Sequence, residues 1–267
     1  MKEIFTYIGI IALSLFSFYY TEKVVNIFKG NDPIMLEIMK AEENYNVPCY
    51  EGSVSKEGVI LGVKGKKVNK IESYNNMKAI GYDDSLLVFE EVKCNITKEN
   101  NINKYILKGN PTKNAISIIV MISKGNIDEY VKLGLEKDVK FSYLVDDKGF
   151  KKYKDKLFNI NSEILYSGYS SKRLKEYIKM MKKNKMSTYC ISLDKDNLDL
   201  CSKENINVIK TSNYFSDNVY INSKKIIKSG EIIIIDDDLK NVEELRVLIN
   251  YLNNKGFKIL TISEHLL

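Results

Sequence analysis

The C-terminal part of this sequence predicts an α/β fold, in which helices cover a mainly parallel sheet. From residue 111 onward, short apolar runs alternate with longer segments in which apolar residues have helical spacing. One run, residues 115–123 (AISIIVMIS), is almost continuously apolar, as expected of a strand that is buried on both faces. The 267 residues, 44% hydrophobic and 28% charged, have the composition of a folded globular protein.

Strands and helices are expected in regular succession over residues 111–267. The expected strands are residues 115–123, 139–145, 163–166, 187–193, 207–210, 231–236 and 258–262. The expected helices are residues 127–137, a loop and helix over 146–158, residues 171–183 and 239–255, and a short terminal helix. His265 in that last helix is the only histidine, so any histidine-dependent catalytic or metal site would have to use it. We expect His265 to be a surface residue without a catalytic role.

Residues 31–110 are predicted to form a small α+β domain, with its boundary at the turn cluster 108–111 (KGNP). Helices are expected over residues 34–45, where Pro33 opens the first turn, and over 71–80; strands are expected over 59–61 and 85–92. Residues 62–68 (GVKGKKV) are interpreted as a turn-rich link. They do not form a phosphate-binding loop, because they lack its GK[ST] ending. A spacer or accessory binding domain is the function we expect here.

Residues 1–30 contain an uncharged run, residues 4–20 (IFTYIGIIALSLFSFYY). As a helix this run would span about 25 Å, just short of the roughly 30 Å hydrocarbon core of a membrane. A cleaved signal peptide is less favoured, because such a peptide needs small residues at its cut site and residues 17–20 (SFYY) are a poor match. A lipoprotein would need a cysteine just after the run, and none is present. A core helix is a poor alternative for an apolar run at the extreme N-terminus. We therefore expect an uncleaved, single-pass membrane anchor.

The net charge of +6 comes mostly from lysine and favours anionic surfaces such as membrane head groups or cell-wall polymers. A generally lysine-rich composition is the simpler explanation of the same excess. The sequence has no zinc finger, aromatic RNA-binding signature or compact arginine cluster, so no nucleic-acid partner is expected. If the body of the chain is extracytoplasmic, disulfides Cys49–Cys94 and Cys190–Cys201 are the pairings within the predicted domains; free buried thiols are the alternative.

Residues 163–171 (EILYSGYSS) are expected to form a strand, a glycine-containing turn and the start of a helix. They resemble the second motif of the NodB-type polysaccharide deacetylases (carbohydrate esterase family 4), which reads Glu-Ile-Gly-Asn-His-Thr-Tyr-Ser-His. The matching residues are Glu163, Ile164, Tyr169 and Ser170.

Two further segments resemble the same family in the same order. Residues 139–146 (VKFSYLVD) are similar to its V-K-A-T-F-F-V strand, and residues 248–266 are similar to its closing helix, strand and T-[LI]-S-E-L ending. The resemblance covers residues 112–267 and implies a distorted (β/α) barrel. Residues 62–77 also resemble the α+β segment that precedes the barrel in some membrane-anchored members, which implies that the body lies outside the cell membrane.

The family's metal-binding and proton-transferring residues are missing from the matching positions. In the family, the first strand ends in Asp-Asp (a base and a metal ligand), the second motif holds two histidine ligands, the third reads Arg-x-Pro, and the fourth holds the acid histidine in Leu-Leu-His-Asp. The positions here are Ser123 and Lys124, then Ser167 and Ser171, then residues 192–194 (SLD), then Asp236 with Asp237. A lysine repels a divalent cation and hydroxyls bind it poorly, so the resemblance implies loss of the metal and of the ordinary mechanism.

Five residues on or beside strand ends are candidates for a ligand groove. Aromatic faces there would suit stacking on sugar rings, although each aromatic is also an ordinary core residue. The acidic run 236–238 suits either a cation or sugar-hydroxyl site or, as we favour, the N-cap of a helix. The candidates are Tyr143, Tyr166, Tyr169, Tyr214 and Asp238.

The resemblance therefore predicts a membrane-anchored, extracytoplasmic protein that has lost catalysis, needs no cofactor, and binds or scaffolds cell-wall glycan. The first alternative is an active carbohydrate N-deacetylase that uses zinc or another divalent metal at a non-standard site built on Asp236 and Asp237. The second alternative is a structural protein without a glycan role. Bound metal would favour the first alternative over the prediction. Binding to purified cell wall would favour the prediction over the second alternative.

Overall fold

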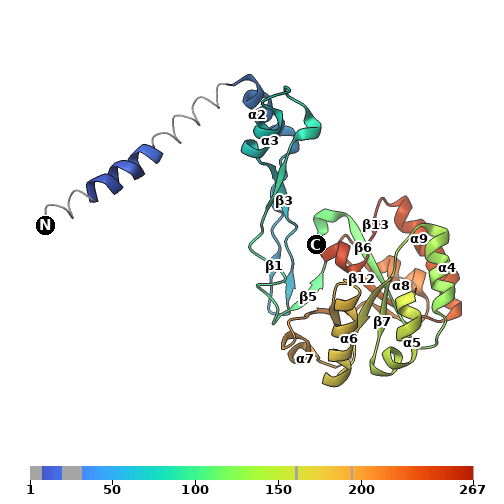
Figure 1. The fold of residues 1–267 in the computed structure, drawn as a ribbon. Coiled ribbons are helices and arrows are strands. Elements are labelled where there is room, and N and C mark those ends of the chain that lie inside the picture. Colours follow the sequence, from blue (N-terminus) through green and yellow to red (C-terminus); the bar gives the residue numbers. More distant parts are fainter. Residues whose placement is uncertain (1–7, 20–31, 160–161, 194, 267) are drawn as a thin grey trace. The chain divides into compact units, whose positions relative to one another are not determined.

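The computed structural model describes residues 8–19, 32–159, 162–193 and 195–266, and the chain divides into two compact units (Figure 1). The smaller unit consists of Met1–Cys49 and Lys64–Lys93, and the larger one of Tyr50–Val63 and Cys94–Leu267. This division differs from the boundary expected near residue 110, because two segments of the expected leading domain belong to the larger unit.

The smaller unit contains two helices and a two-stranded antiparallel ribbon. Its elements are α2 (Pro33–Tyr45), β3 (Gly65–Val68), α3 (Lys70–Met77), the 3-10 turn η1 (Asp84–Leu86) and β4 (Phe89–Val92). Ile38, Val68 and Met77 form its buried centre. The turn-rich link predicted for residues 62–68 is wrong over β3, because that segment pairs with β4 and Lys67 forms a 2.8 Å ion pair with Glu90 across the ribbon.

The larger unit is built on a curled, mainly parallel sheet (Figure 1). The strands are β1 (Ser53–Val54), β2 (Val59–Ile60), β5 (Tyr105–Lys108), β6 (Ala115–Met121), β7 (Ser142–Val145), β8 (Glu163–Tyr166), β9 (Tyr189–Ser192), β10 (Asn207–Lys210), β11 (Tyr214–Phe215), β12 (Ile232–Asp236) and β13 (Lys258–Ile259). Their order is β1-β2-β5-β10-β9-β8-β7-β6-β12-β11, and β13 also pairs with β6. Among the described residues β1 and β11 end this path, so the expected barrel is present as a half-barrel.

The helices of the larger unit follow the strands in alternation, which confirms the predicted α/β class. They are the 3-10 turn η2 (Pro111–Lys113), α4 (Ile127–Lys137), α5 (Asp147–Asn159), α6 (Ser171–Lys183), α7 (Leu198–Ser202), α8 (Val219–Ile226), α9 (Leu239–Asn254) and α10 (Ile262–Leu266). The predicted bounds of α4, α6, β8 and β10 agree with the structure. The sequence prediction missed β1, β5, β11, α7 and α8, which are short and have little periodicity.

Side chains of β6 alternate between two buried cores, one on each face of the sheet. Ile116, Ile118 and Val120 pack into the outer core with side chains of α4, α5, α6 and α9. Ile119 points to the inner core, where α10 contributes Ile262. Because both faces are covered, the strand is apolar almost without interruption, as its sequence predicted.

Strands β2 and β5 join this sheet because they complete the inner core. Val59 of β2 and Ile106 of β5 are fully buried there, and β5 lies between β2 and β10. The buried side-chain amide of Asn110 donates to the carbonyl of Leu61 at 3.1 Å, which fixes the segment around β2 to the start of η2. Pairing with a remote strand is a long-range property, which local sequence patterns do not reveal.

Glu163, matched above to the family motif, holds the C-terminal helix α10 in place. Its carboxylate accepts the N–H groups of Ile262 and Ser263 at 2.8 and 2.9 Å and the hydroxyl of Ser142 at 2.5 Å. A carboxylate at a helix N-terminus satisfies backbone donors that have no partner within the helix. The role of Glu163 is therefore structural.

His265 is buried, so the expectation of a surface residue is wrong. Its ring is 1% exposed and its Nδ1 lies 2.8 Å from the hydroxyl of Ser117 on β6. Gly109 packs against the ring so closely that a Cβ atom there would lie 2.1 Å from Nε2. Burial, with a smaller effect of Lys113, lowers the pKa of His265 to about 4.

Residues 8–19 are helical and all of their side chains are exposed. Residues 4–7 and 20 of the predicted anchor lie outside the described residues. Within the part of the chain that is described, no helix is both long and apolar enough to cross a membrane.

Stability is expected to fall as the pH drops from 6.5 to 4, because the folded state binds fewer protons at His265 than the unfolded state. The contribution is complete above pH 6.5 and decreases by about 3 kcal/mol toward pH 4. Denaturant unfolding of the wild type and of His265→Gln at several pH values measures this contribution. Between pH 6.5 and 4, the free energy of unfolding should change less with pH in the variant. Equal slopes would contradict the assignment to His265.

Candidate functional site

A pocket of about 410 Å³ lies where four neighbouring strands of the sheet end. Ser123 lies just beyond β6, Asp146 follows β7, Ser167 follows β8 and Leu193 follows β9. Parallel strands place their carboxyl ends at one edge, where α/β proteins build their sites. The full lining is Met121, Ile122, Ser123, Asp146, Lys148, Gly149, Lys152, Tyr153, Ser167, Tyr169, Leu193 and Lys195.

The base of the pocket is apolar and its wall carries small polar groups. Met121 and Leu193 pack on the inner core of the sheet. Ser123 and Ser167 also line the pocket, and their hydroxyls donate to Asp237 and to the carbonyl of Val145; the ring of Tyr169 is 40% exposed. An apolar surface beside hydroxyls and an aromatic ring suits a ligand with both apolar and hydroxyl faces.

The charges that line the pocket are mostly positive. Lys148 and Lys152 come from α5 and Lys195 from the loop between β9 and α7. Asp146 is the only carboxylate among the described lining residues, and it accepts the N–H of Gly149 at 2.6 Å, as an N-cap of α5 does. The pocket therefore has an excess of cations.

Asp147 fixes the loop that carries Ser167 and Tyr169. Its carboxylate accepts the hydroxyl of Tyr166 and the N–H groups of Tyr169 and Ser170, at 3.0 and 3.2 Å for the two N–H groups. Gly168 lies against this cluster, where a Cβ atom would be 2.4 Å from the Tyr166 hydroxyl. Only glycine leaves enough room for the loop to close on Asp147.

Asp237 fixes the loop that carries Ser123 and Lys124. Its fully buried carboxylate accepts N–H groups from all four loop residues, with distances between 2.7 and 2.9 Å, and the Ser123 hydroxyl at 3.1 Å. The loop residues are Ser123, Lys124, Gly125 and Asn126. Since every oxygen lone pair has a donor nearby, Asp237 has no capacity left for a metal ion.

The carboxylates of Asp236 and Asp238, on either side of Asp237, also have partners within the protein. Asp236 accepts the Tyr214 hydroxyl on both oxygens at 2.9 Å, and burial raises its pKa. Asp238 caps α9 and forms an ion pair with Lys124, which lowers its pKa. The favoured N-cap interpretation of this acidic run is therefore correct for Asp238.

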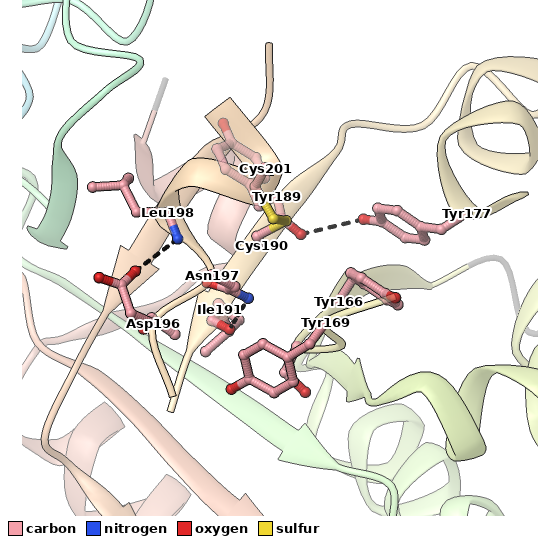
Figure 2. Close-up of a disulfide and its surroundings, with 12 residues drawn as sticks. Tyr166, Tyr169, Tyr177, Tyr189, Cys190, Ile191, Asp196, Asn197, Leu198 and Cys201 are labelled. Carbon is pink, nitrogen blue, oxygen red and sulfur yellow. Dashed lines mark hydrogen bonds between the residues drawn. A yellow bond between two sulfur atoms is a disulfide. The ribbon is translucent and has the colours of Figure 1, made fainter. Parts of the chain in front are cut away.

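A disulfide holds the segment that brings Leu193 and Lys195 to the pocket (Figure 2). Cys190 on β9 is bonded to Cys201 on α7, which confirms this predicted pairing, and none of the four cysteines is free. In the segment between the two cysteines, the carbonyl of Lys195 accepts hydrogen bonds from the hydroxyls of Tyr169 and Ser192, each at 3.1 Å.

The buried side chain of Asn197 also holds this segment. It donates to the carbonyl of Ile191 at 3.1 Å (Figure 2), so the loop is fastened to the end of β9 at two points.

The structure brings only some of the predicted site residues together. Ser123, Ser167 and Tyr169 line the pocket, whereas Ser171 is exposed on α6, Lys124 pairs with Asp238, and Asp236, Asp237 and Tyr214 lie outside its lining. Tyr143 and Tyr166 are core residues and not groove residues: they are 2% and 0% exposed, and burial raises the pKa of both. Asp194 of the third motif lies outside the described residues.

Sequence reasoning missed Asp146, Lys148, Lys152, Tyr153 and Lys195. Asp146 could have been found, because it directly follows a predicted strand. The three lysines could not have been found, since nothing in the local sequence distinguishes a lysine that faces the pocket from one that faces water.

The ligand set of this pocket does not fit a divalent metal ion. Such ions need several carboxylate, imidazole or thiolate donors, and the described lining offers Asp146 alone. No group of three such side chains occurs in the pocket among the residues that the structure describes.

Comparisons with known proteins agree with this fold. No family model matches the sequence. An uncharacterized Bacillus subtilis (strain 168) protein, YlxY, is 30% identical over 110 residues, which are 40% of this chain and 34% of YlxY, so the match covers about a third of that relative.

Solved structures similar to this chain include two of one protein and one of a second protein. BA3943 of Bacillus anthracis, described as a CE4 family pseudoenzyme, has a TM-score of 0.63 at 19% identity over 88% of this chain and 95% of that one. A BA3943 mutant described as having restored enzymatic activity has a TM-score of 0.64 at 19% identity over 88% and 98% of the two chains. PdaA of B. subtilis, a family 4 carbohydrate esterase, has a TM-score of 0.50 at 13% identity over 61% and 85%. The fold is therefore that of the NodB-type deacetylases.

Replacing Asp237 with asparagine is expected to lower the free energy of unfolding by about 3–5 kcal/mol. The amide nitrogen would face backbone N–H donors that now bind a carboxylate. Asp238→Asn is the matched control and should cost much less, because asparagine is also a good N-cap. Denaturant unfolding of both variants measures the difference, and equal losses would contradict the proposed role of Asp237.

Removing the Cys190–Cys201 disulfide is expected to lower the free energy of unfolding by about 3 kcal/mol, because the bond closes a loop of 11 residues in the unfolded chain. Thermal unfolding of the double variant Cys190→Ser/Cys201→Ser, and of the wild type with and without reductant, measures this effect. An unchanged midpoint in the double variant would contradict it.

Proposed function

We propose that this chain is a catalytically inactive, NodB-type protein that is anchored in the cell membrane and binds or scaffolds cell-wall glycan outside it. The observation that carries this proposal is the chemistry of the pocket at the carboxyl ends of β6 to β9. Hydroxyls, an aromatic ring and lysines occupy the place where a deacetylase of this fold would need metal ligands.

The lack of catalysis follows from the side chains around Ser123 and Ser167. Hydrolysis of an acetamide at neutral pH needs an activated water, which a Lewis acid or a well-placed base supplies. Asp146 caps α5, Asp237 binds the loop after β6, and His265 is buried beside Ser117 on β6. No described residue of the pocket is left to act as both base and metal ligand.

Glycan binding is supported by the shape and composition of the pocket. Its volume of about 410 Å³ is in the range of small-ligand sites. The exposed ring of Tyr169 offers a stacking face, and Ser123 and Ser167 line the same pocket. BA3943, the structural neighbour described as a pseudoenzyme, is similar over most of both chains.

Membrane anchoring and an extracytoplasmic position are supported by two features. The helix over residues 8–19 exposes large apolar side chains all along its length, including Leu13, Leu15 and Phe18. A helix that is apolar on every side favours a lipid environment. The Cys190–Cys201 disulfide is typical of proteins outside the cytoplasm.

The test measures cell-wall binding and deacetylase activity on one sample of the full chain in detergent. The wild type should bind purified cell wall and release no acetate from acetylated glucosamine oligomers, with or without added zinc. Tyr169→Ala should weaken binding at least fivefold, because it removes the stacking face. Tyr214→Ala is the matched control, since its ring is similarly exposed at 42% but lies outside the pocket lining, and it should leave binding unchanged.

Two results would overturn the proposal. Acetate release that a chelator abolishes would establish a metal-dependent deacetylase with a non-standard site. Wild-type protein that does not bind the cell wall would favour a structural role without a glycan ligand.

A further inference from the structure

We propose that the ligand of this pocket is an anionic glycan, whose carboxylate or phosphate group is bound by Lys148, Lys152 and Lys195. This inference rests on the proposed glycan-binding function and adds the charge of the ligand. It concerns the residues that the sequence reading did not place in the site.

The three lysines converge on the pocket from two elements. Lys148 and Lys152 are four residues apart on α5 and therefore lie on one face of that helix. Lys195 approaches from the loop after β9, and its carbonyl is held by the hydroxyls of Tyr169 and Ser192. Both elements are fixed in place, so the lysine stems start from defined positions.

The pocket lysines, like Lys151 on α5, form no ion pair with a carboxylate among the described residues, so their charges are not neutralised in this way. On the same helix, Lys154 and Lys156 form ion pairs with Glu176 and Asp128 at 3.8 and 2.6 Å. Within the described residues, Lys148, Lys152 and Lys195 form none. Asp146 lies in the same lining, but it is one carboxylate among three cations and its oxygen already accepts the N–H of Gly149.

Aromatic rings hold two of these ammonium groups near the pocket. Lys195 Nζ lies 5.8 Å from the centre of the Tyr169 ring, and Lys152 Nζ lies 4.7 Å from that of Tyr153. Tyr169 and Tyr153 both line the pocket. Cation–π contacts of this kind restrict a lysine side chain without neutralising its charge.

The resulting field complements an anion. Where a metal-dependent deacetylase surrounds a cation with aspartate and histidine ligands, this pocket places lysines around a space of about 410 Å³. A neutral chain of acetylated hexosamines would leave these charges without partners, whereas a sugar that carries a carboxylate or phosphate would pair with them. Both groups present several anionic oxygens that a lysine ammonium can bind as a point charge, so the shared chemistry is that of an oxyanion on a sugar.

The experiment compares three soluble probes by calorimetry with the full chain in detergent at low salt. The neutral probe is an N-acetylglucosamine tetramer. The carboxylate probe is the same tetramer with a lactyl ether on alternate sugars, and the phosphate probe is the same tetramer with a phosphate group on alternate sugars. One variant removes the pocket cations and the other removes exposed lysines elsewhere on α5 and α6, with the same change of net charge. They are Lys148→Gln/Lys152→Gln/Lys195→Gln and Lys151→Gln/Lys179→Gln/Lys182→Gln.

The wild type should bind one of the anionic probes at least tenfold more tightly than the neutral tetramer. The pocket variant should lose this preference, and the control variant should keep it. Raising the salt concentration should weaken the binding of the anionic probe and leave the binding of the neutral probe unchanged. Whichever anionic probe binds identifies the source of the oxyanion, and thermal unfolding verifies that both variants are folded.

Three outcomes would overturn the inference. Equal affinity for neutral and anionic probes, with loss in Tyr169→Ala, would leave the glycan function standing and remove the anionic preference. An equal loss in the two triple variants would mean that the attraction is general and not specific to the pocket. Failure of all three probes would refute the anionic ligand, while cell-wall binding would still decide the proposed function separately.

Discussion

The parallel pairing of β6 is the constraint on which the larger unit depends. This strand pairs with β7, β12 and β13, and its side chains alternate between the two buried cores. Parallel pairing places the carboxyl ends of neighbouring strands at one edge, so residues from four separate strand ends meet in one pocket. The inner core below supplies the base of that pocket through Met121 and Leu193.

Three carboxylates then give the loops at the two ends of the sheet their shape. Asp237 binds the loop after β6, Asp147 binds the loop after β8, and Glu163 binds the N-terminus of α10. In each case backbone N–H groups from elsewhere in the fold donate to the carboxylate, which compensates for its removal from water. These acids are therefore part of the framework, which explains why an acidic motif persists here without forming a metal site.

The pocket that this framework supports is lined by three lysines and one carboxylate among its described residues. Ser123 and Ser167 occupy the positions that the family resemblance assigns to metal-binding or catalytic residues, and three lysines face the same space. Similarity of the fold to both deacetylases and a described pseudoenzyme does not choose between these functions, because function depends on the side chains at the site. The proposal of binding rather than hydrolysis rests on the lining that the structure describes, in which Asp146 is the one carboxylate.

The sequence by itself determined the α/β class and the bounds of several elements, because periodicity is local, and its family resemblance predicts the loss of the metal ligands. It also identified Ser123, Ser167 and Tyr169, since each lies next to a recognisable strand. Only the tertiary structure decided that Tyr166 and His265 are buried, and that the first strands of the sheet come from the expected leading domain. It likewise decided which lysines face the pocket, because burial and charge pairing depend on contacts between segments that are far apart in the chain.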